Sequence, residues 1–108
     1  MANDISKWSG KRLHFIGIGG AGMSGLARIA LSHGITVTGS DAKDSNVVIA
    51  LTALGANVSV GHNGENVDGA DLIVFSTAIS ENNPERLRAL ELGLPIIARA
   101  TALALLMS

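Results

Sequence analysis

Apolar and polar positions along this chain alternate in blocks that match the periods of strands and helices. Short apolar runs are typical of buried strands, and longer segments with apolar residues at i, i+3 and i+4 are typical of amphipathic helices. The runs predict five strands, at residues 13–16, 35–40, 57–60, 71–76 and 94–98. The spacing and the capping residues predict helices at residues 23–32, 46–54 and 84–92, and a last helix from residue 101.

The order of these elements predicts an α/β fold. Strands and helices alternate, except that the third and fourth strands follow each other without a helix between them. Such alternation predicts a mostly parallel five-stranded sheet with helices on both faces, because a parallel crossover carries a helix back across the sheet. We expect a three-layer, Rossmann-like domain over residues 13–108, with strand order 3-2-1-4-5, after an N-terminal tail at residues 1–12.

A glycine-rich stretch joins the first strand to the first helix. Gly17, Gly19 and Gly22 fit the pattern G-x-G-x-x-G. The N–H groups at a helix start lack intrahelical partners and lie at the positive end of the helix dipole, and glycine lets a diphosphate approach the backbone closely. The stretch therefore predicts an anion site, although a turn that only packs a helix against a strand would fit the same letters.

Three further segments follow the second, third and fourth strands, and so should lie at the same edge of the sheet. Asp41 stands where nucleotide-binding folds place an acid that accepts a hydrogen bond from a ribose or a base; the alternative is a plain turn. His62 is either a ligand contact or a solvated loop residue. The segment Ser76-Thr77-Ala78-Ile79 offers small residues and hydroxyl donors, or is simply the exit of a strand.

Composition narrows the class of protein. The chain has 108 residues, 47% hydrophobic and 16% charged, which indicates one globular domain. Its net charge of −1 gives no support to a role on nucleic acid or at a membrane surface. Cysteine is absent, which excludes a disulfide framework and thiolate metal sites and suits the cytoplasm. No run resembles a transmembrane span or a signal peptide.

Several residues away from the predicted edge have a structural interpretation. His14, within the first strand, is expected to be hydrogen-bonded, and Arg12 is expected to be a solvated charge. The sequence Asn83-Pro84-Glu85 predicts an N-cap, a first-turn proline and a first-turn acid of a helix. Leu87 and Leu90 of that helix are expected to face the core.

The same residues carry a family resemblance. The string His14-Phe15-Ile16-Gly17-Ile18-Gly19-Gly20-Ala21-Gly22-Met23-Ser24-Gly25 closely resembles the opening of the Mur ligases, and its residues 17–23 are typical of the members that add L-alanine. The resemblance covers roughly residues 12–107. The other matching strings are Gly39-Ser40-Asp41, Gly61-His62, Glu65-Asn66-Val67, Ser76-Thr77-Ala78-Ile79 and Asn83-Pro84.

The resemblance implies an ATP-dependent amide ligase of peptidoglycan synthesis. In this family the first domain holds the UDP-sugar, the central domain binds ATP and Mg²⁺, and the last domain binds the amino acid. The carboxylate of UDP-N-acetylmuramate is activated as an acyl phosphate, which the amine of L-alanine attacks. By similarity, the uridine would be surrounded by Asp41, His62, Thr77, Ala78 and Ile79. The diphosphate would be held by Gly19, Gly20, Ala21, Gly22, Met23 and Ser24.

The chain also departs from the family. It contains no G-x-x-x-x-G-K-[ST] phosphate loop, so we expect the N-terminal domain of a longer ligase, with no catalytic residue, metal site or cofactor of its own and no activity alone. Thr101 and Leu105 stand where relatives usually carry glutamates. Two other classes fit less well: the NAD-binding domain of a dehydrogenase, and a nucleotide-sensing module without enzymatic activity.

Overall fold

A computed structural model describes residues 8–107, so residues 1–7 of the predicted N-terminal tail lie outside the described residues. The strands are β1 (Arg12–Ile16), β2 (Thr36–Asp41), β3 (Asn57–Val60), β4 (Leu72–Phe75) and β5 (Ile96–Ala98). The helices are α1 (Met23–Ser32), α2 (Asn46–Ala53), α3 (Pro84–Leu92) and α4 (Arg99–Leu106), with a short 3₁₀ helix, η2 (Gly64–Val67). The predicted strands and α-helices are confirmed, with ends that differ by about two residues at most; η2 was not predicted.

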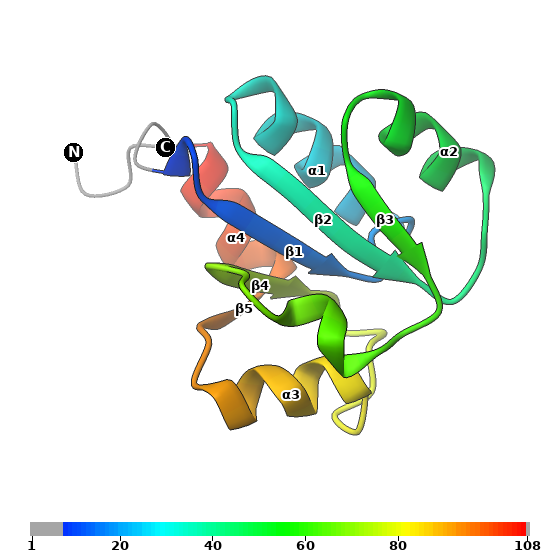
Figure 1. Ribbon diagram of the computed structural model, residues 1–108. Coiled ribbons are helices and arrows are strands. Elements are labelled where there is room, and N and C mark those ends of the chain that lie inside the picture. The colour runs from blue at the N-terminus through cyan, green and yellow to red at the C-terminus, as the bar shows by residue number, and fades with distance from the viewer. Residues whose placement is uncertain (1–7, 108) are drawn as a thin grey trace.

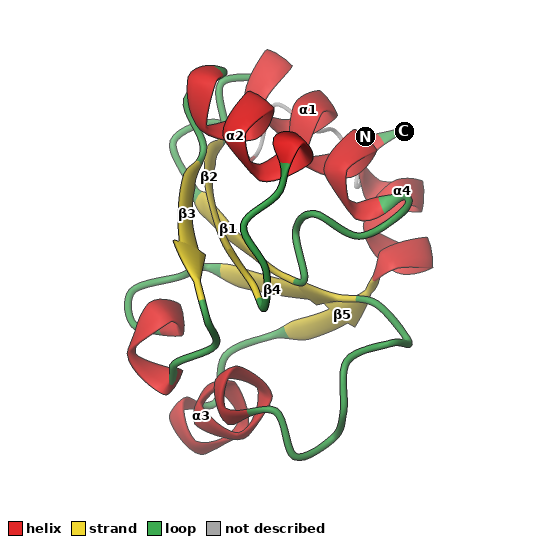
Figure 2. Ribbon diagram, turned by 90° about the vertical axis from the view of Figure 1, so that its right-hand side faces the viewer, coloured by secondary structure: helices red, strands yellow, loops and turns green. Residues whose placement is uncertain are grey.

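The sheet has the strand order β3-β2-β1-β4-β5, and each neighbouring pair is parallel. Both the predicted order and the predicted α/β class are confirmed. Helices α1, α2 and α4 cover one face, and α3 and η2 lie on the other (Figure 1; Figure 2). The carboxyl ends of all strands therefore lie along one side of the sheet, called here the carboxyl edge.

Alternation along β1 sends its side chains into two different cores. Leu13 and Phe15 are buried in the larger core, together with apolar residues of α1 and α4. Ile16 points to the other face and joins the smaller core, with Ala89 of α3. His14 shares the face of Ile16, so the strand pattern alone places a histidine under α3.

The face of the sheet that is covered by α3 is polar where β1 pairs with β2. The parallel register pairs His14 with Thr38 and Ile16 with Ser40. His14 and Ser40 are both buried, with exposed fractions of 1% and 0%. Buried polar groups need hydrogen-bond partners, because an unpaired group costs roughly 1–3 kcal/mol. The first turn of α3 packs against this polar strip.

Helix caps follow the sequence closely. The hydroxyl of Ser45 accepts from the Val48 N–H at the start of α2, as its position predicts. The side chain of Asn83 accepts from the Glu85 N–H, and Pro84 occupies the first turn of α3. Gly93 ends α3 in the left-handed conformation, with φ 71°.

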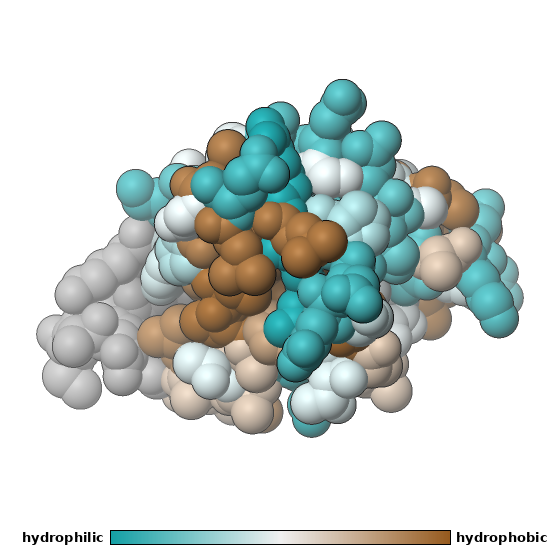
Figure 3. Space-filling model, turned by 90° about the horizontal axis from the view of Figure 1, so that it is seen from below, coloured by the Kyte–Doolittle hydropathy of each residue, from teal (hydrophilic) through white to brown (hydrophobic). Residues whose placement is uncertain are grey.

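The expectation that Leu87 and Leu90 face the core is wrong. Their exposed fractions are 49% and 65%. Helix α3 turns Glu85 and Ala89 inward at i and i+4, so its leucines point away from the sheet. Figure 3, seen from below, shows apolar residues gathered among polar ones on this side of the molecule. Among residues 8–107, no helix has both the length and the hydropathy needed to cross a membrane.

Candidate functional site at the carboxyl edge

The glycine loop, residues 17–22, turns tightly between β1 and α1. The N–H groups of Gly17 and Ile18 both donate to the carbonyl oxygen of Ser40, at 2.8 and 2.9 Å. Gly17 and Gly22 have φ near +80°, where an L side chain is strained. The turn therefore requires glycine at these two positions for its shape, before any ligand is considered.

The loop leaves backbone donors open at the start of α1. Gly22 occupies the N-cap and provides no side-chain cap. Within the described residues, no acceptor meets the N–H groups of Ala21 and Gly22, and both residues are exposed. Ser24 is half-buried in the first turn, and Met23 is buried in the core rather than open to a ligand. Open N–H groups at the positive end of a helix dipole attract anions.

Arg99 is a residue of this edge that the sequence analysis missed. A Cβ placed on Gly22 would lie 3.0 Å from Nη1 of Arg99 and 3.1 Å from its Cδ. The arginine thus stands directly over the glycine loop, with an exposed side chain. The signal was present in the sequence, because Arg99 directly follows β5, and residues after parallel strands collect at the carboxyl edge.

Asp41 is tied to the glycine loop. Its Oδ2 accepts from the Gly19 N–H at 2.9 Å, and its Oδ1 accepts from the Lys43 N–H at 3.2 Å. The residue is half-buried. The plain turn that the sequence allowed does form, through the Lys43 N–H, and the bond to Gly19 gives Asp41 a second role, in holding the loop.

The exit loop of β4, residues 76–79, closes over the glycine loop from the other side. The Ile79 N–H donates to the Ser76 carbonyl at 3.0 Å, which makes a turn. The Ile79 side chain covers Gly17, since a Cβ there would lie 3.0 Å from Cδ1 of Ile79. Thr77 and Ala78 are exposed at the tip of the turn, whereas Ser76 and Ile79 are half-buried.

Arg86 of α3 anchors this exit loop. Its Nη1 donates to the Ile79 carbonyl at 3.1 Å, and its guanidinium carbon lies 4.2 Å from the centre of the Phe75 ring. A cation above an aromatic face is stabilised by the ring quadrupole. Arg86 thereby fixes Ile79 against Gly17.

His62 reaches the edge from the end of β3. Gly61, the residue before it, donates its N–H to the Asp41 carbonyl at 2.6 Å. The Nδ1 atom of His62 lies 2.9 Å from the hydroxyl of Ser40. With an exposed fraction of 19%, the side chain is packed against β2 and still partly open to solvent.

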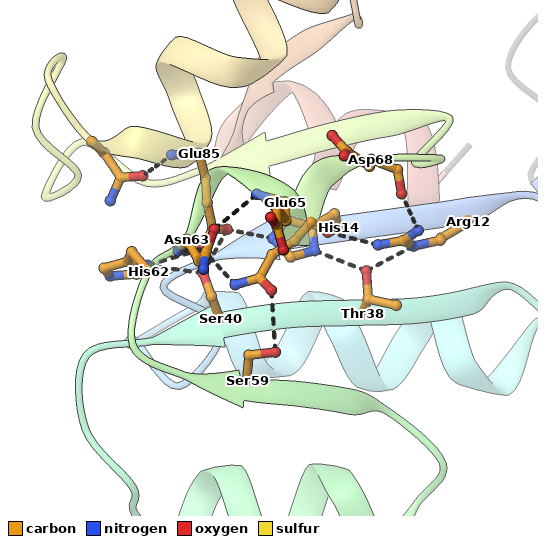
Figure 4. Close-up of polar contacts among 12 residues, drawn as sticks. Arg12, His14, Thr38, Ser40, Ser59, His62, Asn63, Glu65, Asp68 and Glu85 are labelled. Carbon is orange, nitrogen blue, oxygen red and sulfur yellow. Dashed lines mark hydrogen bonds and ion pairs between the residues drawn. The ribbon is translucent and has the colours of Figure 1, made fainter.

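On the face of the sheet that α3 and η2 cover, called here the lower face, Glu85 lies at the centre of a network of polar side chains (Figure 4). It is fully buried and accepts from Nε2 of His14 at 2.5 Å, which confirms that His14 is hydrogen-bonded. Burial on its own would raise the pKa of Glu85, but the hydrogen bonds that it accepts, from His14 first, outweigh burial and lower the pKa from 4.5 to about 2. Glu85 is thus a buried carboxylate, not only the first-turn acid that the sequence suggested.

Arg12 belongs to the same network, so its interpretation as a solvated charge is wrong. Its guanidinium donates to the carbonyls of Asp68 and Asn66, each at 2.7 Å, and its Nε donates to Thr38 Oγ1 at 3.1 Å. Arg12 is the first residue of β1 and lies beside η2 and the residue that follows it, whose backbone carbonyls accept these hydrogen bonds. A sequence pattern gives no sign of carbonyls contributed by residues more than fifty positions away.

A polar cavity of about 210 Å³ lies on this lower face, lined by Arg12, Thr38, Ser59 and Asn66 among others. None of the residues predicted to bind a ligand lines it. The glycine loop, Asp41 and the β4 exit loop are instead brought together by direct contacts, with His62 joined to them through β2 and Gly61. The carboxyl edge is therefore the candidate site.

The parallel sheet, its strand order and the glycine turn at the start of α1 define a Rossmann-like α/β domain. The family model described as Mur ligase family, catalytic domain, matches residues 12–108. The chain belongs to the Mur ligase family.

Individual relatives agree with this assignment. The chain is 54% identical to the UDP-N-acetylmuramate–L-alanine ligase of Persephonella marina over 97 residues, which is 90% of this chain and 21% of that protein. It is 57% identical to the enzyme of the same name from Renibacterium salmoninarum, with the same coverage. The chain thus spans about a fifth of the length of these relatives.

Solved structures show the same fold. The crystal structure of the UDP-N-acetylmuramate-alanine ligase from Thermotoga maritima matches with a TM-score of 0.82 and 35% identity, over 85% of this chain and 21% of that one. The UDP-N-acetylmuramate:L-alanyl-gamma-D-glutamyl-meso-diaminopimelate ligase from Neisseria meningitides matches with a TM-score of 0.76 and 38% identity, over 82% and 28%.

Proposed function

We propose that this chain binds the UDP part of UDP-N-acetylmuramate, as the N-terminal domain of a ligase that adds L-alanine to this nucleotide sugar. The observation that carries the proposal is the convergence of four loops, after β1, β2, β3 and β4, at the carboxyl edge of one parallel sheet. The names of the relatives supply the identity of the nucleotide sugar.

The glycine loop is the proposed diphosphate site. The open N–H groups of Ala21 and Gly22 would donate to phosphate oxygens, and the hydroxyl of Ser24 lies in the same turn. Arg99 would add a positive charge directly above the loop. Gly19 and Gly20 would let the phosphates approach the backbone because neither carries a side chain. A Cβ would also crowd the loop itself, since it would lie 2.9 Å from Oδ2 of Asp41 at position 19 and 3.2 Å from the Gly17 carbonyl at position 20.

The uridine is proposed to lie between the loops that follow β2, β3 and β4. Asp41 and His62 are half-buried on one side. Ser76, Thr77, Ala78 and Ile79 form the other side, with Ile79 fixed against Gly17. The ring of the base would pack on the aliphatic side chain while hydrogen bonds reach the ribose and the base edge.

The remainder of the reaction is proposed to take place in the rest of a longer enzyme, with the 13–108 domain docked against an ATP-binding domain and a domain for L-alanine, in the cytoplasm. We propose that ATP and Mg²⁺ bind to those other parts of the enzyme. The chain has no phosphate-loop motif, and residues 8–107 hold no group of three or more His, Cys, Asp or Glu side chains able to bind a metal ion. We propose that the chain alone has no ligase activity.

Calorimetric titration of the 108-residue chain with UDP-N-acetylmuramate, UDP, uridine, ADP and NAD⁺ tests the proposal. We expect UDP-N-acetylmuramate and UDP to bind with similar affinity, and uridine, which lacks the diphosphate, to bind more weakly. Affinity for NAD⁺ greater than for UDP would favour the dehydrogenase alternative, which the relatives do not support. Equal affinity for ADP and UDP would contradict recognition of the base.

A further inference from the structure

The carboxylate of Glu85 fixes the direction of the hydrogen bonds around it, because an ionised carboxylate accepts and never donates. Each of its oxygens has two donors. Oε1 lies 2.5 Å from Nε2 of His14 and 2.7 Å from the hydroxyl of Ser40. Oε2 accepts from the Asn63 N–H at 3.0 Å and from Nδ2 of Asn66 at 3.1 Å. The side chain is fully buried, so no water competes for these positions.

The Ser40 hydroxyl has a single proton, which it donates in its hydrogen bond to Glu85. At neutral pH Glu85 is ionised, so the 2.7 Å contact between the two oxygens requires the Ser40 hydroxyl to donate. The Ser40 oxygen then has only lone pairs left for Nδ1 of His62, which lies 2.9 Å away. The second nearby atom, Oε2 of Glu85 at 3.5 Å from the same Nδ1, is also an acceptor. Because the Ser40 oxygen and Oε2 of Glu85 can only accept here, Nδ1 of His62 must carry the proton.

We propose that the Glu85–Ser40 pair locks neutral His62 in the tautomer with its proton on Nδ1, so that Nε2 presents a lone pair at the carboxyl edge. In a neutral imidazole one nitrogen donates and the other accepts, and the bond made by the first fixes the role of the second. Nε2 of His62 has no partner within residues 8–107. His62 is thus an acceptor in the candidate site, and Ser40 and Glu85 are its positioning residues.

His14 shows the opposite arrangement on the same carboxylate. Nε of Arg12 donates to the Thr38 hydroxyl, whose own proton is then free to be donated to Nδ1 of His14, 2.8 Å away. His14 in turn donates from Nε2 to Glu85. Figure 4 shows both histidines beside this one carboxylate. By the donors and acceptors around them, the buried His14 and the half-buried His62 carry their protons on opposite nitrogens.

This tautomer specifies the ligand group that His62 recognises, a conclusion that rests on the proposed binding of UDP. A lone pair on Nε2 accepts from a neutral N–H or O–H donor, such as the imide of uracil or a ribose hydroxyl. It repels a carbonyl or a phosphate oxygen, because neither has a proton to donate. Recognition of a donor group would discriminate uridine from nucleosides that present an acceptor at this place.

Nitrogen-15 NMR of the histidine-labelled chain at pH 8, above the range in which histidines ordinarily titrate, tests the proposal without a ligand. The sequence has three histidines, and His33 is exposed at the end of α1, so it serves as an internal reference for an imidazole that exchanges between tautomers. We expect a protonated Nδ1 and an unprotonated Nε2 for His62, and the reverse for His14. A protonated Nε2 on His62 would overturn the proposal.

Two variants separate the effect of the Ser40 contact on His62 from general effects on Glu85. Ser40→Ala removes the nearer acceptor of Nδ1 and leaves only Oε2 of Glu85, at 3.5 Å, so we expect the His62 resonances to move toward those of His33. Asn66→Ala is the matched control, because it removes another donor to Glu85 and leaves the contact between Ser40 and His62 intact. The tautomer of His62 should not change in it. If Ser40→Ala fails to fold, the measurement on the unmodified chain still decides.

Addition of UDP to the unmodified chain tests the ligand part. We expect the Nε2 resonance of His62 to shift upfield, as it does when a lone pair accepts a hydrogen bond, while Nδ1 stays protonated. Saturating UDP that leaves this resonance unmoved would overturn recognition of a donor group but not the tautomer. UDP that fails to bind at all would overturn the ligand part together with the proposed function, and the tautomer measured without ligand would stand.

Discussion

The N–H group of Gly19 donates a hydrogen bond to Oδ2 of Asp41 across 2.9 Å. This bond joins the glycine loop to the end of β2, so the acid predicted to read the ribose also holds the loop proposed to bind the diphosphate. The two proposed roles are therefore coupled, and no substitution at Asp41 changes one of them alone.

The Asp41 coupling can be measured with two substitutions. Asp41→Ala removes the acceptor for both Gly19 and Lys43, and each lost hydrogen bond typically costs about 0.5–1.5 kcal/mol. We expect a fall in melting temperature and a roughly three- to tenfold loss of UDP affinity. Asp41→Asn keeps an acceptor oxygen toward Gly19 and should retain most of both. Calorimetry and thermal melts check this, and unchanged UDP affinity in Asp41→Ala would remove Asp41 from the site.

Gly22 offers a test of the loop, with a matched control at Gly25 in the adjoining helix α1. Gly22→Ala places a Cβ at φ +80° and 3.0 Å from Arg99, so strain of about 1–2 kcal/mol adds to displacement of the arginine. We expect a loss of UDP affinity of about tenfold or more. Gly25→Ala, with open space around its Cβ, should leave affinity unchanged and stabilise α1 by up to about 1 kcal/mol. Equal affinities in the two variants would contradict the loop assignment.

Arg99 is predicted to bind the diphosphate through its charge. Arg99→Ala should weaken UDP binding about three- to tenfold, and the loss should shrink at high salt because exposed charges are screened. Binding of uridine, which has no phosphate, should not change. Arg28→Ala is the control, since Arg28 is exposed in the middle of α1, away from the loop. An Arg99→Ala variant that binds UDP as well as Arg28→Ala does would refute the role.

The buried carboxylate predicts how stability depends on pH. The folded-state pKa of Glu85 lies below its ordinary value of 4.5, at about 2, so its contribution is fully present above 4.5 and is lost as the pH falls toward 2. That shift corresponds to roughly 3 kcal/mol of unfolding free energy. Denaturant unfolding between pH 7 and pH 2 should show this loss, and Glu85→Gln should be less stable at pH 7 and lose less on acidification. A Glu85→Gln variant with the same pH profile as the unmodified chain would disprove the linkage.

The fold could be predicted because each local signal agreed with the others. The apolar run 72–75 marked a strand, the glycine turn ending at residue 22 marked the start of α1, and the cap at Asn83 marked the start of α3, as the structure has them. The leucines of α3 could not be placed by spacing alone. Their helix packs through Ala89 and the buried Glu85, and its contact with the sheet is too narrow to cover Leu87 and Leu90.

The candidate site was only partly visible in the sequence. Segments that follow parallel strands were predictable as neighbours, and Arg99 would have been found had the same rule been applied after β5. The network of Arg12, Ser40 and Glu85 was not predictable, because its members come from β1, β2 and α3 and meet only through the register of the sheet. A first-turn acid of a helix and a buried carboxylate have the same sequence signature.

Amide chemical-shift mapping tests the central claim most directly, because it locates the ligand as well as detecting it. With UDP added to the nitrogen-15-labelled chain, we predict saturable shifts concentrated at residues 17–24, at Asp41 and His62, at residues 76–79 and at Arg99. Shifts confined to the lower face around Thr38, Ser59 and Asn66, or no saturable shifts with UDP at all, would contradict the assignment of the carboxyl edge as a UDP site.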